Sequence, residues 1–353
     1  MEQPKEQRCC LPETEDSGDL TFLLSHQLRT PLTSIKGAIG LLLSGKVDPE
    51  TDKGQRLLRI AAKNADRLVR FTTAIENDKS TSMKIVSSSE MERFLLEDDL
   101  RLAWECQEFK LVYQPIVCSK TNMIQGFEAL LRWDHPIRGS VSPTEFIPIA
   151  EENQLIHDLG LWVLERACKQ LRQWQDRFPR SKPLWISVNL SALQLLDPDL
   201  VDKVRQICEE TAIAPGSLRL EITETALFEH SQTAVTTLHE LKDLDIPLYL
   251  DDFGTGYSCL SRLNELSVKL LKVDRSFVRQ EQWFMIKGIL HLAMGLGLEA
   301  IIEGVETPEE LAQVEALGCH QIQGYLFSQP VTADDASELL TKGISLDRYA
   351  LVE

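Results

Sequence analysis

Two adjacent aspartates, Asp251 and Asp252, end a short apolar run and precede a turn that contains Gly254 and Gly256. Neighbouring carboxylates repel each other unless a cation neutralises them. Glycines let the backbone turn sharply and come close to a ligand. The pair by itself is ambiguous, because Asp-Asp before glycine is also a common turn sequence. Whether it binds metal therefore depends on which other polar residues the fold brings beside it.

Other polar residues also stand at the ends of short apolar runs. They are Glu128, Asn189, Glu221, Glu224, Lys272, Asp274, Glu303, Glu306 and Gln323. If these runs are parallel strands of a barrel, their carboxyl ends meet on one rim. Oxygen ligands suit hard cations such as Mg²⁺ or Mn²⁺ rather than zinc. Several carboxylates on one rim indicate a two-ion site, the arrangement that hydrolyses phosphodiesters.

The apolar runs themselves predict eight strands with amphipathic helices between most of them. The expected strands are Leu111–Val117, Ile124–Arg132, Leu184–Leu190, Leu218–Thr223, Leu248–Asp252, Leu270–Val273, Ala300–Glu303 and Cys319–Leu326. The first two strands have no helix between them. Eight strands with helical crossovers predict an α/β fold, a barrel of the (β/α)8 TIM type with an irregular start.

The bulk composition limits the classes of function. A length of 353 residues predicts two domains, and 43% hydrophobic residues are enough for a packed core. The net charge of −17 falls entirely in residues 91–353, because the first 90 residues carry 13 basic and 13 acidic side chains. This acidity argues against binding to DNA or RNA, which needs a basic surface. We expect no membrane span, no signal peptide, and a cytoplasmic protein whose 8 cysteines are reduced.

The N-terminal quarter has a different pattern. We expect a disordered leader over residues 1–18, helices from Asp19 to Ser44 and from Asp48 to Asn77, and a linker over residues 78–90. Pro31 predicts a local kink. Each helix carries one apolar stripe, so the pair predicts an antiparallel hairpin that dimerises into a four-helix bundle. The barrel then occupies residues 91–345.

The run Ser25-His-Gln-Leu-Arg-Thr-Pro-Leu32 resembles the phosphoacceptor box of the histidine kinase dimerisation domain, over residues 19–77. Gln27 departs from that family, which usually has an acidic residue after the histidine. No ATP-binding domain follows, so His26 cannot be phosphorylated by this chain. Two interpretations stay open: His26 is a phosphoacceptor served in trans by a histidine kinase, or the hairpin serves for dimerisation alone.

The remaining motifs resemble the EAL family of cyclic di-GMP phosphodiesterases, in that family's order. They are Tyr113-Gln-Pro-Ile116, Glu128-Ala-Leu-Leu-Arg132, Val188-Asn-Leu-Ser191, Glu221-Ile-Thr-Glu224, Asp251-Asp-Phe-Gly-Thr-Gly-Tyr257, Leu271-Lys-Val-Asp-Arg275, Glu303-Gly-Val-Glu-Thr307 and Gln323-Gly-Tyr325. The resemblance implies a modified barrel with one antiparallel strand, and a cyclic-guanylate-specific phosphodiesterase. It implies hydrolysis of cyclic di-GMP to linear pGpG in a bacterial signalling pathway, with the hairpin as a regulatory module.

The resemblance also assigns roles by position. The implied metal ligands are Glu128, Asn189, Glu221, Asp251, Asp252 and Glu306. The implied catalytic residues are Glu303 as general base, Lys272 on the attacking water, and Glu128. The implied substrate contacts are Arg132, Gln323, Asp274 and Gln114. Glu224 is expected to anchor the glycine loop after Asp252, which in this family lies near the dimer interface, so we expect a homodimer through both the hairpin and the barrel.

One rival function and one unexplained residue remain. The chain could be a catalytically weak cyclic di-GMP receptor that signals through the hairpin. Cys259 stands where this family usually has serine, just after the glycine loop, and is either a small packing residue or a redox-sensitive thiol.

Overall fold

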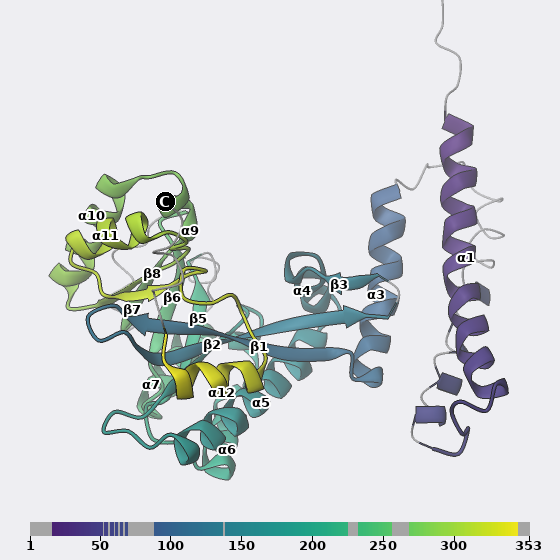
Figure 1. The fold of residues 1–353 in the computed structure, drawn as a ribbon, viewed down its shortest axis with the longest axis horizontal. Coiled ribbons are helices and arrows are strands. Elements are labelled where there is room, and N and C mark those ends of the chain that lie inside the picture. The colour runs from purple at the N-terminus through teal and green to yellow at the C-terminus, as the bar shows by residue number, and fades with distance from the viewer. Residues whose placement is uncertain are drawn as a thin grey trace, which may run out of the picture. The chain divides into compact units, whose positions relative to one another are not determined.

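The computed structural model describes residues 16–51, 53–55, 57–59, 61–62, 64–65, 68–69, 88–136, 138–224, 232–255 and 268–344. Most of the predicted leader and linker, together with Gly256, Cys259 and the side chain of His26, lie outside the described residues. The chain divides into two compact units (Figure 1). One comprises residues 1–96 with 136–139, and the other residues 97–135 with 140–353.

The first unit contains helix α1, Asp16–Leu43. It begins three residues before the predicted Asp19 and continues through Pro31 without ending there. The described residues between 53 and 69 are helical as well. Ala38, Ala61 and Leu96 are among its buried apolar residues, at 4%, 8% and 7% exposure.

The second unit is a closed barrel of eight strands, as the sequence predicts. The strands are β1 Phe109–Cys118, β2 Met123–His135, β4 Trp185–Asn189, β5 Leu218–Thr223, β6 Leu248–Phe253, β7 Leu270–Val273, β8 Glu299–Ile302 and β9 Gln321–Gln323. Their order is β1-β9-β8-β7-β6-β5-β4-β2, and pairing of β1 with β2 closes the circle. β1 is antiparallel to both neighbours and the other barrel pairs are parallel, so the expected antiparallel strand is confirmed. A short strand β3, Gly139–Val141, adds to β2 outside the circle.

Helices cover the outside of the barrel (Figure 1). They are α4 Pro143–Glu152, α5 Leu155–Arg177, η2 Gln194–Leu196, α6 Leu200–Thr211, α7 Gln232–Asp243, α9 Arg275–Arg279, α10 Trp283–Leu296, α11 Pro308–Ala316 and α12 Ala333–Lys342. Helix α3, Ser88–Cys106, precedes β1 and contains the boundary between the two units. The expected helices between the strands are present. α3, α4 and α12 are additional, and α3 begins inside the segment that we predicted as a linker.

Two clusters of buried apolar residues form the core of the barrel. The larger lies between strands and helices and includes Phe127, Leu164 and Leu220. The smaller fills the barrel interior below the rim and consists of Ile116, Trp185, Tyr249, Leu270 and Ile301. Tyr249 lies two residues before Asp251, and Leu270 lies two residues before Lys272. Residues two apart on a strand point to the same face, so these interior residues and the polar rim residues form successive inward layers. The interior layer is therefore the floor of the candidate site.

The last strand is shorter than predicted. We expected Cys319–Leu326, but β9 ends at Gln323. A β-carbon on Gly324 would lie 1.9 Å from the carbonyl oxygen of Val305, so the backbones touch there. The chain then turns, and the amide of Phe327 donates to the carbonyl of Gly324 (3.1 Å). The turn ends the strand and leaves Gln323 on the rim.

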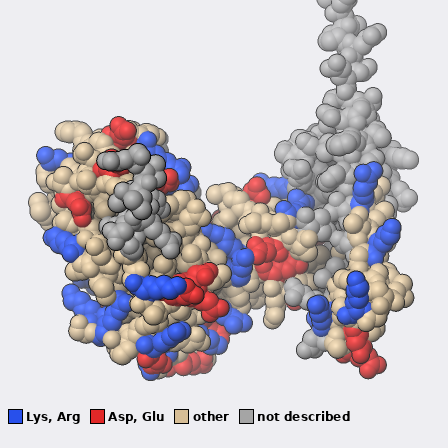
Figure 2. All heavy atoms as spheres, in the orientation of Figure 1, with Lys and Arg blue, Asp and Glu red and all other residues tan. Residues whose placement is uncertain are grey.

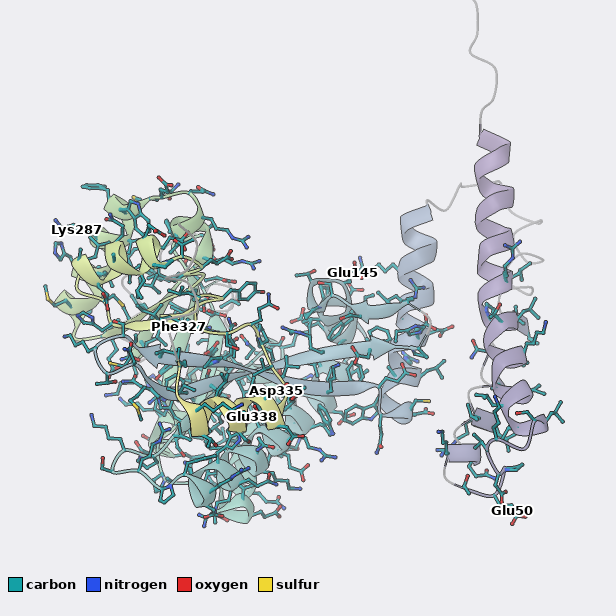
Figure 3. The ribbon with its side chains drawn as sticks, in the orientation of Figure 1. Glu50, Glu145, Lys287, Phe327, Asp335 and Glu338 are labelled. Atoms are coloured by element: carbon teal, nitrogen blue, oxygen red, sulfur yellow. The ribbon has the colours of Figure 1, made fainter. Side chains whose placement is uncertain are left out.

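The surface carries mixed charge, with Lys and Arg interspersed among Asp and Glu on the visible face (Figure 2). Lys287 points outward from α10 (Figure 3), consistent with its exposed position. Of the helices that the structure describes, none combines the length and the apolar character needed to cross a membrane.

Candidate active site

Lys272 lies at the centre of the rim and joins four carboxylates from four parts of the barrel. Its Nζ is 2.7 Å from Glu221 of β5, 3.2 Å from Glu128 of β2 and 3.1 Å from Asp251 of β6. It is 2.6 Å from Glu303, which follows β8. The side chain of Lys272 is only 1% exposed. The strand ends that the sequence pattern picked out therefore meet around one buried cation.

Amide side chains hold Glu128 in place. Asn189 Nδ2 donates to one of its oxygens (2.8 Å), and Gln323 Nε2 donates to the other (2.7 Å). Gln323 Nε2 also donates to Gln114 Oε1 (3.0 Å). β1, β2, β4 and β9 thus contribute to one network of hydrogen bonds. Such a network fixes the orientation of a carboxylate before any ligand binds.

The cluster shifts the pKa values of its members in different directions. Burial raises the pKa of Glu221 well above its usual range, and the neighbouring Glu128 adds to this. Burial also raises the pKa of Glu303 to about 8, although Lys272 opposes the shift. At Glu128, burial is outweighed by Lys272 and by the amide hydrogen bonds, so its pKa is lowered. Burial works against the charged form of Lys272, but the surrounding carboxylates raise its pKa further.

Asp252 differs from the buried carboxylates. Burial and the adjacent Asp251 raise its pKa to about 6. Its φ is +53°, in the left-handed region that costs a non-glycine residue about 1 kcal/mol or more. Backbone strain of this kind concentrates at functional sites. Asp251, one residue earlier, stays within the cluster around Lys272.

The carboxylates fit divalent cations. In the part of the chain that the structure describes, two groups have ligand atoms within 4.8 Å of one another, and Asp251 belongs to both. One is Glu128, Glu221 and Asp251, and the other is Asp251, Asp252 and Glu303. Glu221 is fully buried, and its Oε1 has no hydrogen-bond partner among the described residues. An all-oxygen set with a buried unpaired carboxylate oxygen suits Mg²⁺ or Mn²⁺.

A cavity of about 440 Å³ opens above the cluster. All members of the cluster except Glu221 line it, and so do Asp274, Glu306, Arg275 and Tyr325, whereas Asn189 lines a different cavity. Arg275 was not among the predicted site residues, although it follows Lys272 and Asp274 in one motif. Its backbone passes so close to Gly304 that a β-carbon there would lie 2.3 Å from Arg275 Cβ, and Gly304 has a φ of +74°. The glycine lets the two rim segments touch and brings Arg275 to the cavity.

Two expected rim residues have other contacts. Glu306 is half-exposed and pairs with Arg279 of α9 (3.4 Å), so it lies outside both metal-competent groups of described residues. Asp274 lines the cavity, but its Oδ1 accepts the amide of Ser276 (2.9 Å) and caps α9.

Arg132 points to a second, mainly apolar cavity of about 440 Å³. The two cavities meet at Leu130, which lines both. Burial lowers the pKa of Arg132, and the nearby Glu128 opposes that shift. A ligand that spans both cavities would therefore pass Arg132 and the carboxylate cluster together.

Glu224 follows β5 and is 2% exposed. Its Oε2 accepts the amide of Gly254 (3.2 Å), two residues after Asp252. A β-carbon on Gly254 would lie 2.8 Å from the ring of Phe277, and its φ is +97°. The carboxylate and the close packing together hold the loop that carries Asp252.

Comparison with known proteins agrees with this geometry. Residues 97–330 match the sequence model of the EAL domain, and residues 19–76 match that of the His Kinase A (phospho-acceptor) domain. The bifunctional diguanylate cyclase/cyclic di-GMP phosphodiesterase MucR of Pseudomonas aeruginosa is 37% identical over 70% of this chain and 37% of its own length. The cyclic di-GMP phosphodiesterase NbdA of the same organism is 39% identical over 69% of this chain and 32% of its own length. The chain thus spans about a third of these relatives.

The solved structure of the MucR phosphodiesterase in complex with c-di-GMP superposes with a TM-score of 0.65 at 37% identity. It covers 69% of this chain and 99% of that chain.

Proposed function

Because this chain belongs to the EAL domain family, we propose that it hydrolyses cyclic di-GMP to linear pGpG with the aid of two Mg²⁺ or Mn²⁺ ions. The observation that carries the proposal is the set of four carboxylates around Lys272 at the floor of a cavity. The names of MucR and NbdA, and the c-di-GMP complex of MucR, support the choice of substrate.

The chemistry is an in-line displacement at phosphorus. Water attacks one phosphodiester, a new P–O bond forms, and the bond to the ribose 3′ oxygen breaks with transfer of a proton from solvent to that oxygen. We assign Glu128, Asn189, Glu221 and Asp251 to one ion, and Asp251 and Asp252 to the other. Ions bound there would act as Lewis acids, lower the pKa of water and favour the charged forms of the carboxylates beside them. Glu306 can bind a metal ion only when its ion pair with Arg279 is broken.

The chain's own residues do the rest. Glu303 accepts the proton of the attacking water, and Lys272, 2.6 Å from Glu303, orients that water and stabilises charge on the phosphoryl oxygens. Arg132 is suited to clamp a phosphate with its planar fork. Gln323 and Gln114 keep Glu128 oriented, and Asp274 reaches substrate from the cavity wall. The two cavities that meet at Leu130 offer separate places for the two halves of a dinucleotide.

The decisive experiment measures pGpG formation from cyclic di-GMP with Mg²⁺ or Mn²⁺, for the wild type and Glu128→Ala. We expect the substitution to reduce kcat by about 100-fold or more, and chelation of the metal to abolish turnover. Glu209→Ala, on the exposed surface of α6, is the control and should leave kcat unchanged.

Two outcomes would overturn the proposal. One is tight binding of cyclic di-GMP by folded wild type with no pGpG, which would establish the receptor function instead. The other is equal turnover of the wild type and Glu128→Ala, which would exclude the metal mechanism.

We further propose that the HisKA-like segment joins two chains and so regulates the barrel, in the bacterial cytoplasm where cyclic di-GMP acts. The match over residues 19–76 supports a dimerisation role. Phosphorylation of His26 by a histidine kinase in trans is the second role that this match supports, and incubation with a cognate kinase and labelled ATP would detect it.

A further inference from the structure

A second polar cavity, which we call the outer cavity, lies on the outer side of β1. Its volume is about 550 Å³, and it is formed by the end of α3, by β1, by α5 and by the first residue of α12. It shares no lining residue with the catalytic cavity. Tyr113 lines the outer cavity and Gln114 lines the catalytic one, because neighbouring residues of a strand point to opposite faces.

Two tryptophans form a corner of the outer cavity. Trp104 of α3 and Trp162 of α5 meet edge to face, with ring centres 6.4 Å apart and planes at 80°. Both are half-buried, so part of each ring remains open to a ligand. Tyr113 is 4% exposed, and burial raises the pKa of its hydroxyl, which therefore stays protonated. The walls can thus stack on a flat ring and offer a neutral hydrogen-bonding group.

The charge of the outer cavity is positive, in a chain whose net charge is −17. Lys110, Arg166 and Lys169 line it, and its described lining contains no Asp or Glu. Lys110 and Lys169 pair with carboxylates of Asp134 and Glu165 beyond the lining.

Arg166 is different from the two lysines. Its guanidinium lies 5.7 Å from the centre of the Trp162 ring, and it has no ion pair among the described residues. A cation over an aromatic face keeps its hydrogen-bond donors free for an anion. The outer cavity therefore places one available positive charge directly beside a stacking surface.

Gln107, at the rim of the outer cavity, has an unfavourable backbone. The amide of Gln107 donates to Trp104 (3.4 Å) and that of Glu108 to Ala103 (3.0 Å), which is the Schellman ending of a helix. Glycine usually occupies the left-handed position of this motif, but Gln107 adopts it with a φ of +56°. Retaining glutamine there places an amide on the cavity wall, and Gln170 and Gln173 line it as well.

We propose that the outer cavity binds a flat aromatic ring that carries one anionic group. The ring stacks in the corner of Trp104 and Trp162, the anion pairs with Arg166, and the glutamine amides contact the polar edge of the ring. A nucleoside monophosphate and an aromatic carboxylate both have this chemistry. The volume of about 550 Å³ falls within the usual range of small-molecule sites.

The experiment is calorimetric titration of the full-length protein with five probes: GMP, guanosine, ribose 5-phosphate, indole-3-acetate and inorganic phosphate. We expect a ring that carries an anion to bind at least about tenfold more tightly than the ring or the anion alone. Binding of GMP identifies a nucleotide site, and binding of indole-3-acetate alone identifies a site for aromatic carboxylates. Indole N–H signals of Trp104 and Trp162 should shift with the bound probe.

Arg166→Gln should weaken the bound probe about tenfold or more, because a charge-assisted bond is lost. Arg166 is exposed, so this variant should fold. Arg172→Gln is the matched control, since Arg172 lies on the same helix, pairs with Asp176 (2.7 Å) and does not line the cavity. The proposal is overturned if none of the ring anions binds, if binding survives Arg166→Gln, or if saturating cyclic di-GMP displaces the probe.

Discussion

At the scale of single residues, Lys272 is the cation around which the carboxylates of the rim assemble. Four carboxylates lie within 3.2 Å of its Nζ, and all four are also members of the metal-competent groups Glu128/Glu221/Asp251 and Asp251/Asp252/Glu303. Buried like charges are unfavourable without such a partner. Lys272 therefore stabilises the metal-free barrel as well as taking part in the proposed chemistry.

The first prediction concerns stability rather than turnover. Lys272→Met should lower the free energy of unfolding of the metal-free protein by about 3 kcal/mol, because carboxylates lose their buried partner. Saturating Mg²⁺ should then stabilise the variant more than the wild type, since the ion replaces the missing charge. Urea unfolding with and without Mg²⁺ measures both quantities.

Lys269→Met is the control for this prediction, because Lys269 is exposed just before the same strand. It should change neither quantity. If Mg²⁺ raised the free energy of unfolding equally in the wild type and in Lys272→Met, Lys272 would not be taking the place of a bound metal ion.

At the scale of elements, two rim segments depend on close backbone contacts. The loop after β6 is held by Glu224 through the amide of Gly254, and the segment after β8 touches α9 where Gly304 meets Arg275. Neither Glu224 nor Gly304 belongs to the metal-competent groups. Both act by fixing where neighbouring side chains lie.

Glu224→Ala should weaken Mg²⁺ binding about tenfold, since supporting residues typically contribute that much. The loop that carries Asp252 loses its anchor while every proposed ligand remains. Glu224→Gln keeps an acceptor for the Gly254 amide and should bind nearly as well as the wild type. Isothermal titration with Mg²⁺ would expose an error if Glu224→Ala retained full affinity.

Gly304→Ala tests the second contact. Gly318 has a φ of +90° with nothing within 4 Å of a β-carbon, so Gly318→Ala should cost about 1 kcal/mol for the backbone alone. Gly304→Ala adds overlap with Arg275, and the total should reach about 2–3 kcal/mol. Urea unfolding of the two variants compares them directly. Equal losses would mean that Arg275 moves aside without cost.

At the scale of the whole molecule, the two units differ in charge and in exposed apolar surface. Residues 91–353 carry the entire net charge of −17, and the first 90 residues carry none. The described part of the N-terminal unit exposes large apolar side chains on its helices, among them Ile39 at 41%, Leu41 at 42% and Leu43 at 83%. A helical pair that leaves such residues exposed is suited to pairing with a second copy.

We therefore predict that the full chain sediments as a dimer and that Ile39→Glu shifts it towards monomer, because a charge would be buried in the helical interface. Lys46→Glu, in the exposed turn after α1, adds negative charge without altering the apolar surface and should leave the dimer intact. Sedimentation equilibrium measures the distribution. A monomeric wild type at micromolar concentration would disprove pairing through the hairpin.

Much of the barrel could be predicted because its strands and helices are recognisable from short stretches of sequence. Alternating strands and helices predict the fold, and parallel strands bring their carboxyl ends to one rim, so Glu128, Glu221 and Asp251 could be grouped from their places in the chain. Helix α3 could also have been found, since Leu96, Leu100 and Ala103 have helical spacing and are buried. The premature end of β9 at Gln323 could not, because the contact of Gly324 with Val305 joins distant segments.

The sequence by itself determined which residue types reach the rim, since strand periodicity and chain order place them there. Only the tertiary structure decided how they pair. In the folded barrel Lys272 lies among four carboxylates, and Glu306 pairs with Arg279. Asp274 caps a helix, and Arg275 lines the catalytic cavity. Folding also assembles the outer cavity from α3, β1 and α5. The physical reason is that the electrostatic energy of an ion pair depends on the distance between its two charges. For side chains far apart in the sequence, that distance is set only when the barrel closes.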